Sequence, residues 1–288
     1  MAGISQPIPR GTFLLGALAA GIGPLAGAIT APNRASAAVR PASIRSAASL
    51  GPLINIPQTW NNCGPATIAE VLAYWGIART QDEVRAVLRV DGGVAGMTPY
   101  GAPSYARSVG LRTLVGVGGN QTLIKALVAA GIPVIVHQVV SLADPVGHWR
   151  PIEGFDDRQG VFTASDPYLG PNHLISYGDF ASMWAQRGYA FLVLYPASRQ
   201  GVVSAAVAAS HWNQATAFAA DLALLRTNQL DASPAGTPAS ESVGYRYLGM
   251  AWDAAHMGQA ATARSYLRLA TNAGVNQTEA QWVGAAIG

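Results

Sequence analysis

The sequence predicts an α+β fold in which helices pack on an antiparallel sheet, followed by a small all-helical region. Segments with the apolar spacing of helices come first, and β-branched segments joined by short turns come later, an order typical of α+β domains. Beyond a turn-rich stretch at Pro196–Gly201, the chain is rich in alanine and keeps a helical pattern. We therefore expect an α+β domain over residues 53–196 and a helical domain over residues 202–288.

The N-terminal residues are typical of a secretory signal peptide. Arg10 precedes the apolar run Phe13–Thr30, and Ala35-Ser36-Ala37 has the small-residue pattern of a cleavage site. We expect residues 1–37 to be the signal peptide and residues 38–52 to be a flexible leader. The mature protein would then be secreted, periplasmic or in the cell envelope. A retained membrane anchor is the alternative, but the glycine content of the run argues against it.

Helical segments fill the first part of the α+β domain. Thr80 and Glu83 have the spacing of a capping box, which opens a helix. The expected helices cover Cys63–Trp75, Thr80–Val90, Pro103–Val109 and Gln121–Ala130. A short apolar stretch at Leu53–Pro57 indicates an edge strand.

The pattern then changes to that of strands. Pro133–Val140 is apolar and β-branched, as in a buried strand. Turn-forming residues at Asp156–Gly160 indicate a hairpin. The expected strands cover Pro133–Val140, His148–Gly154, Val161–Ala164 and Tyr189–Tyr195, with a short helix at Asp179–Gln186.

The C-terminal region is a series of alanine-rich helices. They are expected over Ser204–Asn228, Ser240–His256, Ala260–Ala273 and from Thr278 onward, with a linker at Ala232–Ala239. Small residues between Tyr247 and Ala270 follow the spacing of one tetratricopeptide unit. The region is therefore either tetratricopeptide-like, which would suit a protein partner, or an ordinary helical bundle.

Charge and composition argue against several partners. The chain has 18 basic and 15 acidic residues, and cleavage of the signal peptide would leave 16 and 15, a formal charge of about +1. The sequence has no basic run and no alternation of basic and aromatic residues, the patterns typical of nucleic-acid binding. It also lacks a His/Cys cluster with metal-ligand spacing. We expect no nucleic acid, no metal and no cofactor.

Cys63 is the only cysteine, so no internal disulfide can form. Its place at the start of an expected helix puts the thiol at the positive end of the helix dipole, which lowers a thiol pKa. A buried unreactive thiol and an intermolecular disulfide are the alternatives. A nucleophilic cysteine also needs a histidine base and a group that orients the imidazole.

His148 and Asp166 are the candidates for these two roles. His148 stands at the head of one hairpin strand, and Asp166 stands just after the end of the other. Because hairpin strands are antiparallel, the start of one lies beside the end of the other. We therefore expect Cys63, His148 and Asp166 to form a triad.

The other histidines fit the role of base less well. His137 lies inside an apolar strand, which favours a packing role, and His173 follows a Pro-Asn pair in a loop. His211 and His256 fall in the alanine-rich helices. Asp144 could lie near the same cleft, but no strand pairing brings it there.

Several separated motifs resemble those of a known enzyme family. In order they are "NNCGPATIAEVLAYWG", "GIPVIVHQVV", "GHWRPIEGFDD", "ASDPYLG" and "FASMW" with "GYAFLVLYP". Over Leu53–Pro196 the sequence is similar to the papain-like cysteine peptidases related to the bacteriocin-processing, double-glycine-leader peptidases. The resemblance implies a papain-like fold, with Cys63 as nucleophile, His148 as general base and then acid, and Asp166 as the group that orients the imidazole.

The resemblance also implies an oxyanion-binding role for Gln58, because a glutamine shortly before the cysteine donates to the oxyanion in this family. Gln58 precedes Cys63 by one residue less than the common papain-like spacing. The processing peptidases are usually fused to a transporter, but the sequence shows no second apolar span and no G-x-x-x-x-G-K-[ST] loop. We therefore expect a stand-alone type, and the double-glycine-leader substrate does not carry over.

We expect an exported thiol hydrolase that cleaves peptide or other amide bonds through an acyl-enzyme. An acyltransferase or transpeptidase on the same triad is one alternative, because the acylation half-reaction is common to both. A non-catalytic binding module with an inert Cys63 is the other. The expected partners are a peptide or protein substrate and, at the C-terminal helices, a protein, with no membrane span after signal cleavage.

Overall fold

The computed structural model describes residues 45–90, 96–234, 237 and 241–288. The expected signal peptide, with its cleavage site, and the first part of the expected leader lie outside these residues. Within the described ranges, no helix is both long and apolar enough to cross a membrane.

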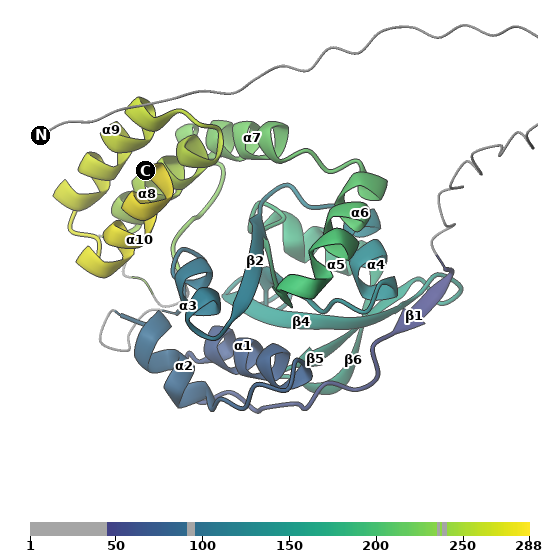
Figure 1. Cartoon of the computed structure of the whole chain (residues 1–288). Helices are drawn as coiled ribbons and strands as arrows, with labels where there is room; N and C mark the ends of the chain where they lie inside the picture. The colour runs from purple at the N-terminus through teal and green to yellow at the C-terminus, as the bar shows by residue number, and fades with distance from the viewer. Residues whose placement is uncertain (1–44, 91–95, 235–236, 238–240) are drawn as a thin grey trace, which may run out of the picture. The chain divides into compact units, whose positions relative to one another are not determined.

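One antiparallel sheet forms the centre of the α+β part (Figure 1). Its strands follow the order β2-β7-β3-β4-β5-β6, and β1 pairs with the C-terminal end of β4. The strands are β1 (Ala47–Ser49), β2 (Leu111–Gly116), β3 (Val134–Val139), β4 (Gly147–Asp156), β5 (Val161–Asp166), β6 (Gly170–Ser176) and β7 (Phe191–Pro196). The expected hairpin is confirmed, because β4 and β5 pair antiparallel across a tight turn.

Helices cover both faces of the sheet. Alternate residues of β3 face opposite sides: Val134 and Val136 pack in one core cluster, and Ile135 packs in the other. The helices are α1 (Cys63–Tyr74), α2 (Gln81–Leu88) and α3 (Ala102–Ser108) on the Ile135 face, and α4 (Gln121–Ala129) and α5 (Tyr177–Ala185) on the other. The α+β fold class is confirmed, and so is the capping box of α2, formed by Thr80 and Glu83.

The edge strands differ most from the expectation. The sequence does not predict β2 and β6, the first and last strands of the sheet order. Each faces a neighbouring strand on one side only, so its side chains are partly exposed and the apolar alternation is weak. β1 lies within the stretch expected to be flexible. It forms because β4 extends past the start of β3, which leaves the backbone of Gly154–Asp156 open to pairing.

The edge strand expected at Leu53–Pro57 is wrong. This segment pairs with carboxylates instead of a strand: the N–H of Leu53 donates to Glu153 Oε2 at 2.7 Å, and the N–H of Ile56 donates to Glu70 Oε1 at 2.8 Å. The segment therefore runs from β4 past α1 and carries Gln58 to the groove that Cys63 also lines.

The C-terminal region is helical, as expected. It comprises α6 (Gln200–Ser210), α7 (Gln214–Arg226), α8 (Ser242–His256), α9 (Ala260–Asn272) and α10 (Gln277–Ile287). The single helix expected over Ser204–Asn228 is wrong, because His211 adopts a left-handed φ of 57° and ends α6. Trp212 follows this break and packs edge-on against Phe191 of β7, their ring centroids 5.2 Å apart. The region thus rests on the sheet, while its tetratricopeptide character and the domain boundary stay predictions.

Candidate active site

Cys63 is the first residue of α1, and its side chain is buried. The helix is fixed to the sheet one turn later, where the Thr67 hydroxyl donates to the Trp149 carbonyl of β4 at 3.0 Å. The residue directly after Cys63 must be glycine, because a Cβ on Gly64 would lie 2.8 Å from the Cβ of Met97. The local sequence therefore holds the thiol at the positive end of α1 and close against β4.

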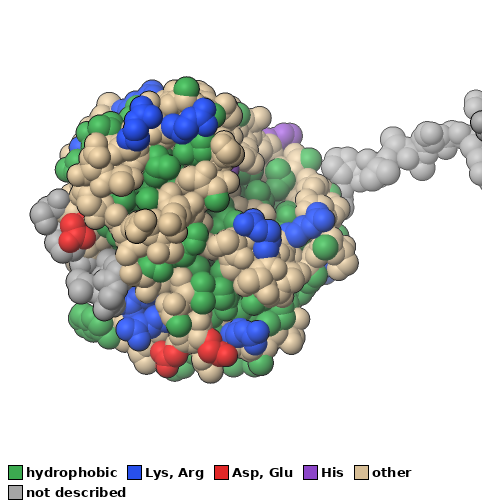
Figure 2. Space-filling model, turned by 60° about the vertical axis from the view of Figure 1, so that its left-hand side comes forward, with side chains coloured by type: hydrophobic (Ala, Val, Ile, Leu, Met, Phe, Trp, Pro, Cys, Tyr) green, Lys and Arg blue, Asp and Glu red, His purple; other side chains and the backbone are tan. Residues whose placement is uncertain are grey.

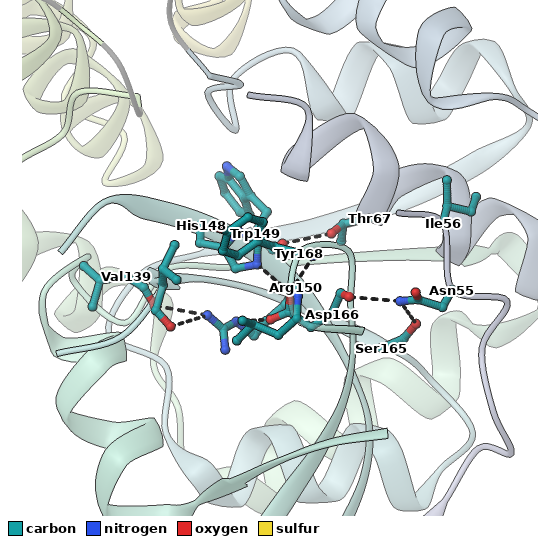
Figure 3. Close-up of polar contacts among 12 residues, drawn as sticks. Asn55, Ile56, Thr67, Val139, His148, Trp149, Arg150, Ser165, Asp166 and Tyr168 are labelled. Atoms are coloured by element: carbon teal, nitrogen blue, oxygen red, sulfur yellow. Dashed lines mark hydrogen bonds and ion pairs between the residues drawn. The ribbon is translucent and has the colours of Figure 1, made fainter. Parts of the chain in front are cut away.

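His148 and Asp166 meet at one end of the β4–β5 hairpin, as expected. His148 Nε2 lies 3.0 Å from Asp166 Oδ1, and both side chains are buried (Figure 3). His148 also interacts with the thiol of Cys63, which raises the pKa of the imidazole. Because Nε2 is taken by Asp166, Nδ1 is the ring nitrogen that remains for the sulfur. The structure thus brings the three predicted residues into one chain of contacts.

Arg150 is a further member of this cluster. It is fully buried on β4, two residues after His148, and its Nε forms an ion pair with Asp166 Oδ2 at 3.2 Å (Figure 3). Its Nη2 donates to the carbonyls of Val139 and Val140 at 3.1 and 3.0 Å. The guanidinium therefore joins the carboxylate to the end of β3.

Asp166 accepts donors from its own loop as well. The backbone N–H groups of Tyr168 and Leu169 each donate to Oδ1 at 2.8 Å. The carboxylate therefore has an imidazole and two backbone donors on one oxygen and Arg150 on the other. Its orientation relative to His148 is fixed from both sides.

The pKa values of the cluster shift in the directions that favour a thiolate and an imidazolium. Burial alone would raise the pKa of Cys63, but the hydrogen bond and charge of His148, with the N–H groups of Trp149 and Gly64, lower it. Burial would lower the pKa of His148, but Asp166 and then Cys63 raise it. Burial would also raise the pKa of Asp166, yet His148, Arg150 and a backbone N–H hold it well below its usual range.

Gln58 lies beside the thiol. It lines a groove of about 440 Å³ together with Cys63 and His148, and its N–H donates to the carbonyl of Pro167 at 2.8 Å. Its position depends on Glu70 of α1, which binds the backbone of Ile56 two residues earlier. Burial raises the pKa of Glu70 to about 8, so this carboxyl is mostly protonated at neutral pH.

The groove has apolar and aromatic walls and a single carboxylate. Trp60 is 83% exposed and Tyr168 is 62% exposed, and both line it beside Val146. Asp144 is the only acidic side chain among the described residues that line this groove.

The remaining histidines lie elsewhere. His137 stacks on Trp149 at a centroid distance of 4.2 Å, and burial holds its pKa well below the usual value, in keeping with a packing role. His173 is half-buried on β6, not in a loop, and burial lowers its pKa. His211 ends α6, and His256 packs on Phe218 in the helical region. None of the described residues forms a cluster of three or more potential metal ligands.

Sequence reasoning missed Arg150 and Glu70. Arg150 follows His148 by two residues on the same strand, so the two side chains fall on the same side of β4. Glu70 follows Cys63 by seven residues, two helical turns, on the same face of α1. In both cases a charged residue shares one face of a strand or helix with an expected catalytic residue, and the rest of that element is apolar and buried. This pattern could have identified both residues.

A comparison with protein families decides the class of this fold. Residues 52–191 match the model of the Peptidase_C39 like family. This part of the chain is similar to the members of that family. The match runs to the first residue of β7 and leaves the C-terminal helices outside it. The resemblance to papain-like, C39-type peptidases is thereby confirmed, and the Peptidase_C39-like part is that of a cysteine peptidase-like hydrolase.

Solved structures with similar chains include two peptidase domains. One is a double glycine motif protease from an AMS/PCAT transporter in complex with the leader peptide (21% identity, 52% of this chain, 94% of that chain, TM-score 0.41). The other is the peptidase domain of Streptococcus ComA, a bi-functional ABC transporter involved in a quorum sensing pathway (22% identity, 49% of this chain, 96% of that chain, TM-score 0.41). A search of curated protein sequences finds no match to this chain.

Proposed function

We propose that this protein is an exported cysteine peptidase that cleaves peptide or other amide bonds with Cys63, His148 and Asp166. The observation that carries the proposal is the buried His148–Asp166 pair, whose imidazole interacts with the Cys63 thiol at the start of α1. The opposite pKa shifts of the thiol and the imidazole support a thiolate–imidazolium pair, the reactive form of such a site.

Acylation begins when the Cys63 thiolate attacks the scissile carbonyl carbon. The carbonyl electrons move to the oxygen, and the side-chain amide of Gln58 and the N–H of Cys63 donate to the resulting oxyanion. The imidazolium of His148 then gives its proton to the leaving nitrogen. The C–N bond breaks, the amine departs and a thioester remains on Cys63.

Deacylation uses the same groups in reverse. Neutral His148 takes a proton from water, and the water oxygen attacks the thioester carbonyl. The C–S bond breaks, the acid product leaves, and the thiolate–imidazolium pair is restored. Asp166 keeps one tautomer and one orientation of the imidazole throughout, and Arg150 keeps Asp166 ionised.

Two further parts of the proposal concern the ends of the chain. Residues 1–37 serve as a signal peptide that directs the protein to the cell envelope or the exterior, as the apolar run and the small-residue pattern suggest. The C-terminal helices contribute to the binding of the peptide or protein substrate.

The reactivity of Cys63 tests the proposal. We expect iodoacetamide to alkylate Cys63 faster than a free-peptide thiol at mildly acidic pH, because the thiol pKa is lowered. His148→Ala should slow this alkylation by at least about tenfold by removing the imidazolium partner. A rate equal to that of the free thiol across this pH range would refute the thiolate–imidazolium pair.

Catalysis itself requires a substrate test. Incubation of the full chain with a peptide library should give cleavage products that are absent with Cys63→Ala. Repetition with an added amine separates hydrolysis from acyl transfer, because a transferase would give the amide product in place of the acid. A reactive Cys63 that cleaves no peptide would overturn the peptidase assignment.

A further inference from the structure

A second cavity adjoins the catalytic groove. Its volume is about 700 Å³, and its walls come from two sides of the molecule. One side is the loop before His148, with Val146 and Gly147, and the turn after α5, with Arg187. The other side is formed by Asn228–Pro234, Thr237 and the first turns of α8, all of which lie outside the family match.

The cavity and the groove share part of a wall. Val146 and Gly147 line both. Gly147 directly precedes His148, and a Cβ at this position would lie 3.1 Å from both Arg187 Nη2 and His137 Nε2. A chain that occupies the groove beside His148 can therefore continue past these two small or exposed residues into the cavity.

The lining of the cavity carries an excess of positive charge. Arg187 forms an ion pair with Asp231 at 3.1 Å, which offsets its charge. Arg246 of α8 also lines the cavity, but among the described residues no carboxylate lies within ion-pair distance of it. Its Nη1 donates to the neutral side-chain oxygen of Asn228, and its Nε is buried without a hydrogen-bond partner.

Helix α8 adds to the positive electrostatic potential in the cavity. Its first residues, Ser242 and Val243, line the cavity, so the positive end of its dipole faces the same space as Arg246. Glu241, the exposed N-cap residue of α8, offsets part of this dipole but does not line the cavity. Arg246 and the dipole of α8 both favour an anion there.

We propose that this cavity binds an acidic segment of the peptide on which Cys63 acts, with Arg246 as the residue that selects a carboxylate. The proposal rests on the proposed peptidase function for the identity of the ligand as a substrate. It assigns to the C-terminal helices a direct part in substrate choice. The cavity is large enough for more than one peptide residue, and its wall of backbone and polar side chains suits an extended chain.

A binding measurement tests the selection without catalysis. Two fluorescein-labelled hexapeptides, Ala-Ala-Glu-Glu-Ala-Ala and Ala-Ala-Gln-Gln-Ala-Ala, are titrated with the full chain carrying Cys63→Ala, and fluorescence anisotropy is recorded. We expect the acidic peptide to bind about tenfold more tightly, since a charge-assisted hydrogen bond adds to the common contacts. Added salt should weaken the binding of the acidic peptide and leave the binding of the neutral peptide unchanged.

Variants then assign the preference to this cavity. Arg246→Gln should reduce the preference to less than about twofold, and Arg246→Lys should keep part of it because the charge remains. Arg264→Gln, at an exposed site on α9, removes the same charge and should leave the preference intact. Equal affinity for both peptides, or a preference that survives Arg246→Gln, would overturn the proposal.

A protection measurement tests the continuity of cavity and groove. The acidic peptide, at a concentration that saturates binding, should slow alkylation of Cys63 in the otherwise unchanged chain several-fold, and the slowing should be lost in Arg246→Gln. If the acidic peptide binds tightly but does not slow alkylation of Cys63, the proposed path of the peptide from the groove into the cavity is wrong. If the thiol proves unreactive and no peptide is cleaved, the peptidase function fails while the anisotropy result still decides carboxylate binding.

Discussion

Two groups of buried carboxylates in this molecule have opposite charge states. Asp166 is fully buried, yet its pKa lies well below the usual range. Asp221 of α7 and Asp253 of α8 are also buried and hydrogen-bond each other, and their pKa values are raised, that of Asp221 to about 7. The surroundings of Asp166 therefore favour its charged form, and those of Asp221 and Asp253 favour the neutral form.

The difference lies in the partners and not in the burial. Asp166 has Arg150, a charged His148 and backbone N–H donors around it. Among the described residues, no basic side chain forms an ion pair with Asp221 or Asp253. Burial raises the pKa of both carboxyls, and Asp221 raises that of Asp253 further. Burial without Arg150 would therefore push Asp166 toward the protonated state, in which it supports the imidazolium less well.

The largest expected effect comes from Arg150→Met. Loss of the guanidinium leaves Asp166 buried with one charge partner fewer, so its pKa rises and the imidazolium loses support. We expect the free energy of unfolding to fall by about 3–5 kcal/mol, typical of a broken buried ion pair. The pH midpoint for alkylation of Cys63 should also move upward. Urea unfolding and the pH–rate profile measure the two effects.

Two other substitutions test whether the effect comes from the charge of Arg150 at this site. Arg150→Lys keeps the charge and should retain part of the low midpoint, whereas Arg158→Met, at an exposed turn, should change neither quantity. An unchanged pH midpoint in a folded Arg150→Met protein would mean that Arg150 serves only packing.

Asp253→Asn removes one carboxyl of the Asp221–Asp253 pair. It should raise the free energy of unfolding, whereas Arg150→Met should lower it. A raised folded-state pKa means that the native chain keeps a proton that the unfolded chain has lost above about pH 4, so wild-type stability falls as pH rises through this window. Asparagine cannot ionise, so the variant lacks this fall in stability with rising pH. We expect Asp253→Asn to be more stable than the wild type at pH 8 by on the order of 1–3 kcal/mol, with a smaller gap at pH 5.

Asp166→Asn is the matched comparison. Its folded-state pKa is lowered, so its stabilising contribution is present above the unfolded-state pKa and is lost as pH falls. Asp166→Asn should therefore be less stable than the wild type at pH 8 and approach it in acid. Urea unfolding at several pH values would contradict the comparison if both variants changed stability in the same direction at pH 8.

Glu70→Gln tests a third buried carboxyl, near the catalytic groove. Its pKa is raised to about 8, so wild-type stability should fall between about pH 4.5 and pH 8, and the amide should remove this fall. We expect a gain on the order of 1 kcal/mol at pH 8 and a change of less than twofold in alkylation of Cys63. Glu241→Gln, at an exposed site, is the control, and a loss of stability at pH 8 would contradict the protonated state of Glu70.

The sequence predicts the parts of the site that depend on local register. Cys63 follows from the helix start, and His148 and Asp166 meet because a hairpin has only one antiparallel register that fits its turn. Arg150 could not be assigned in the same way, because an arginine in a strand is usually exposed and its burial depends on carbonyls at the end of β3. The cavity beside Arg246 depends on how α8 meets the loop before His148, a contact between distant segments that no local pattern encodes.

His173→Ala should have the smallest effect. His173 lies on β6 opposite Ala164, two residues before Asp166 in β5, so it is the histidine that could replace His148 as the base. Burial lowers its pKa, so it is neutral at neutral pH and adds no charge to the thiolate site. We expect alkylation of Cys63 to stay within about twofold of the wild type and stability to change by less than about 1 kcal/mol. A tenfold loss of alkylation rate in His173→Ala, with His148→Ala unaffected, would move the base to β6 and leave the buried ion pair of Asp166 and Arg150 without a catalytic role.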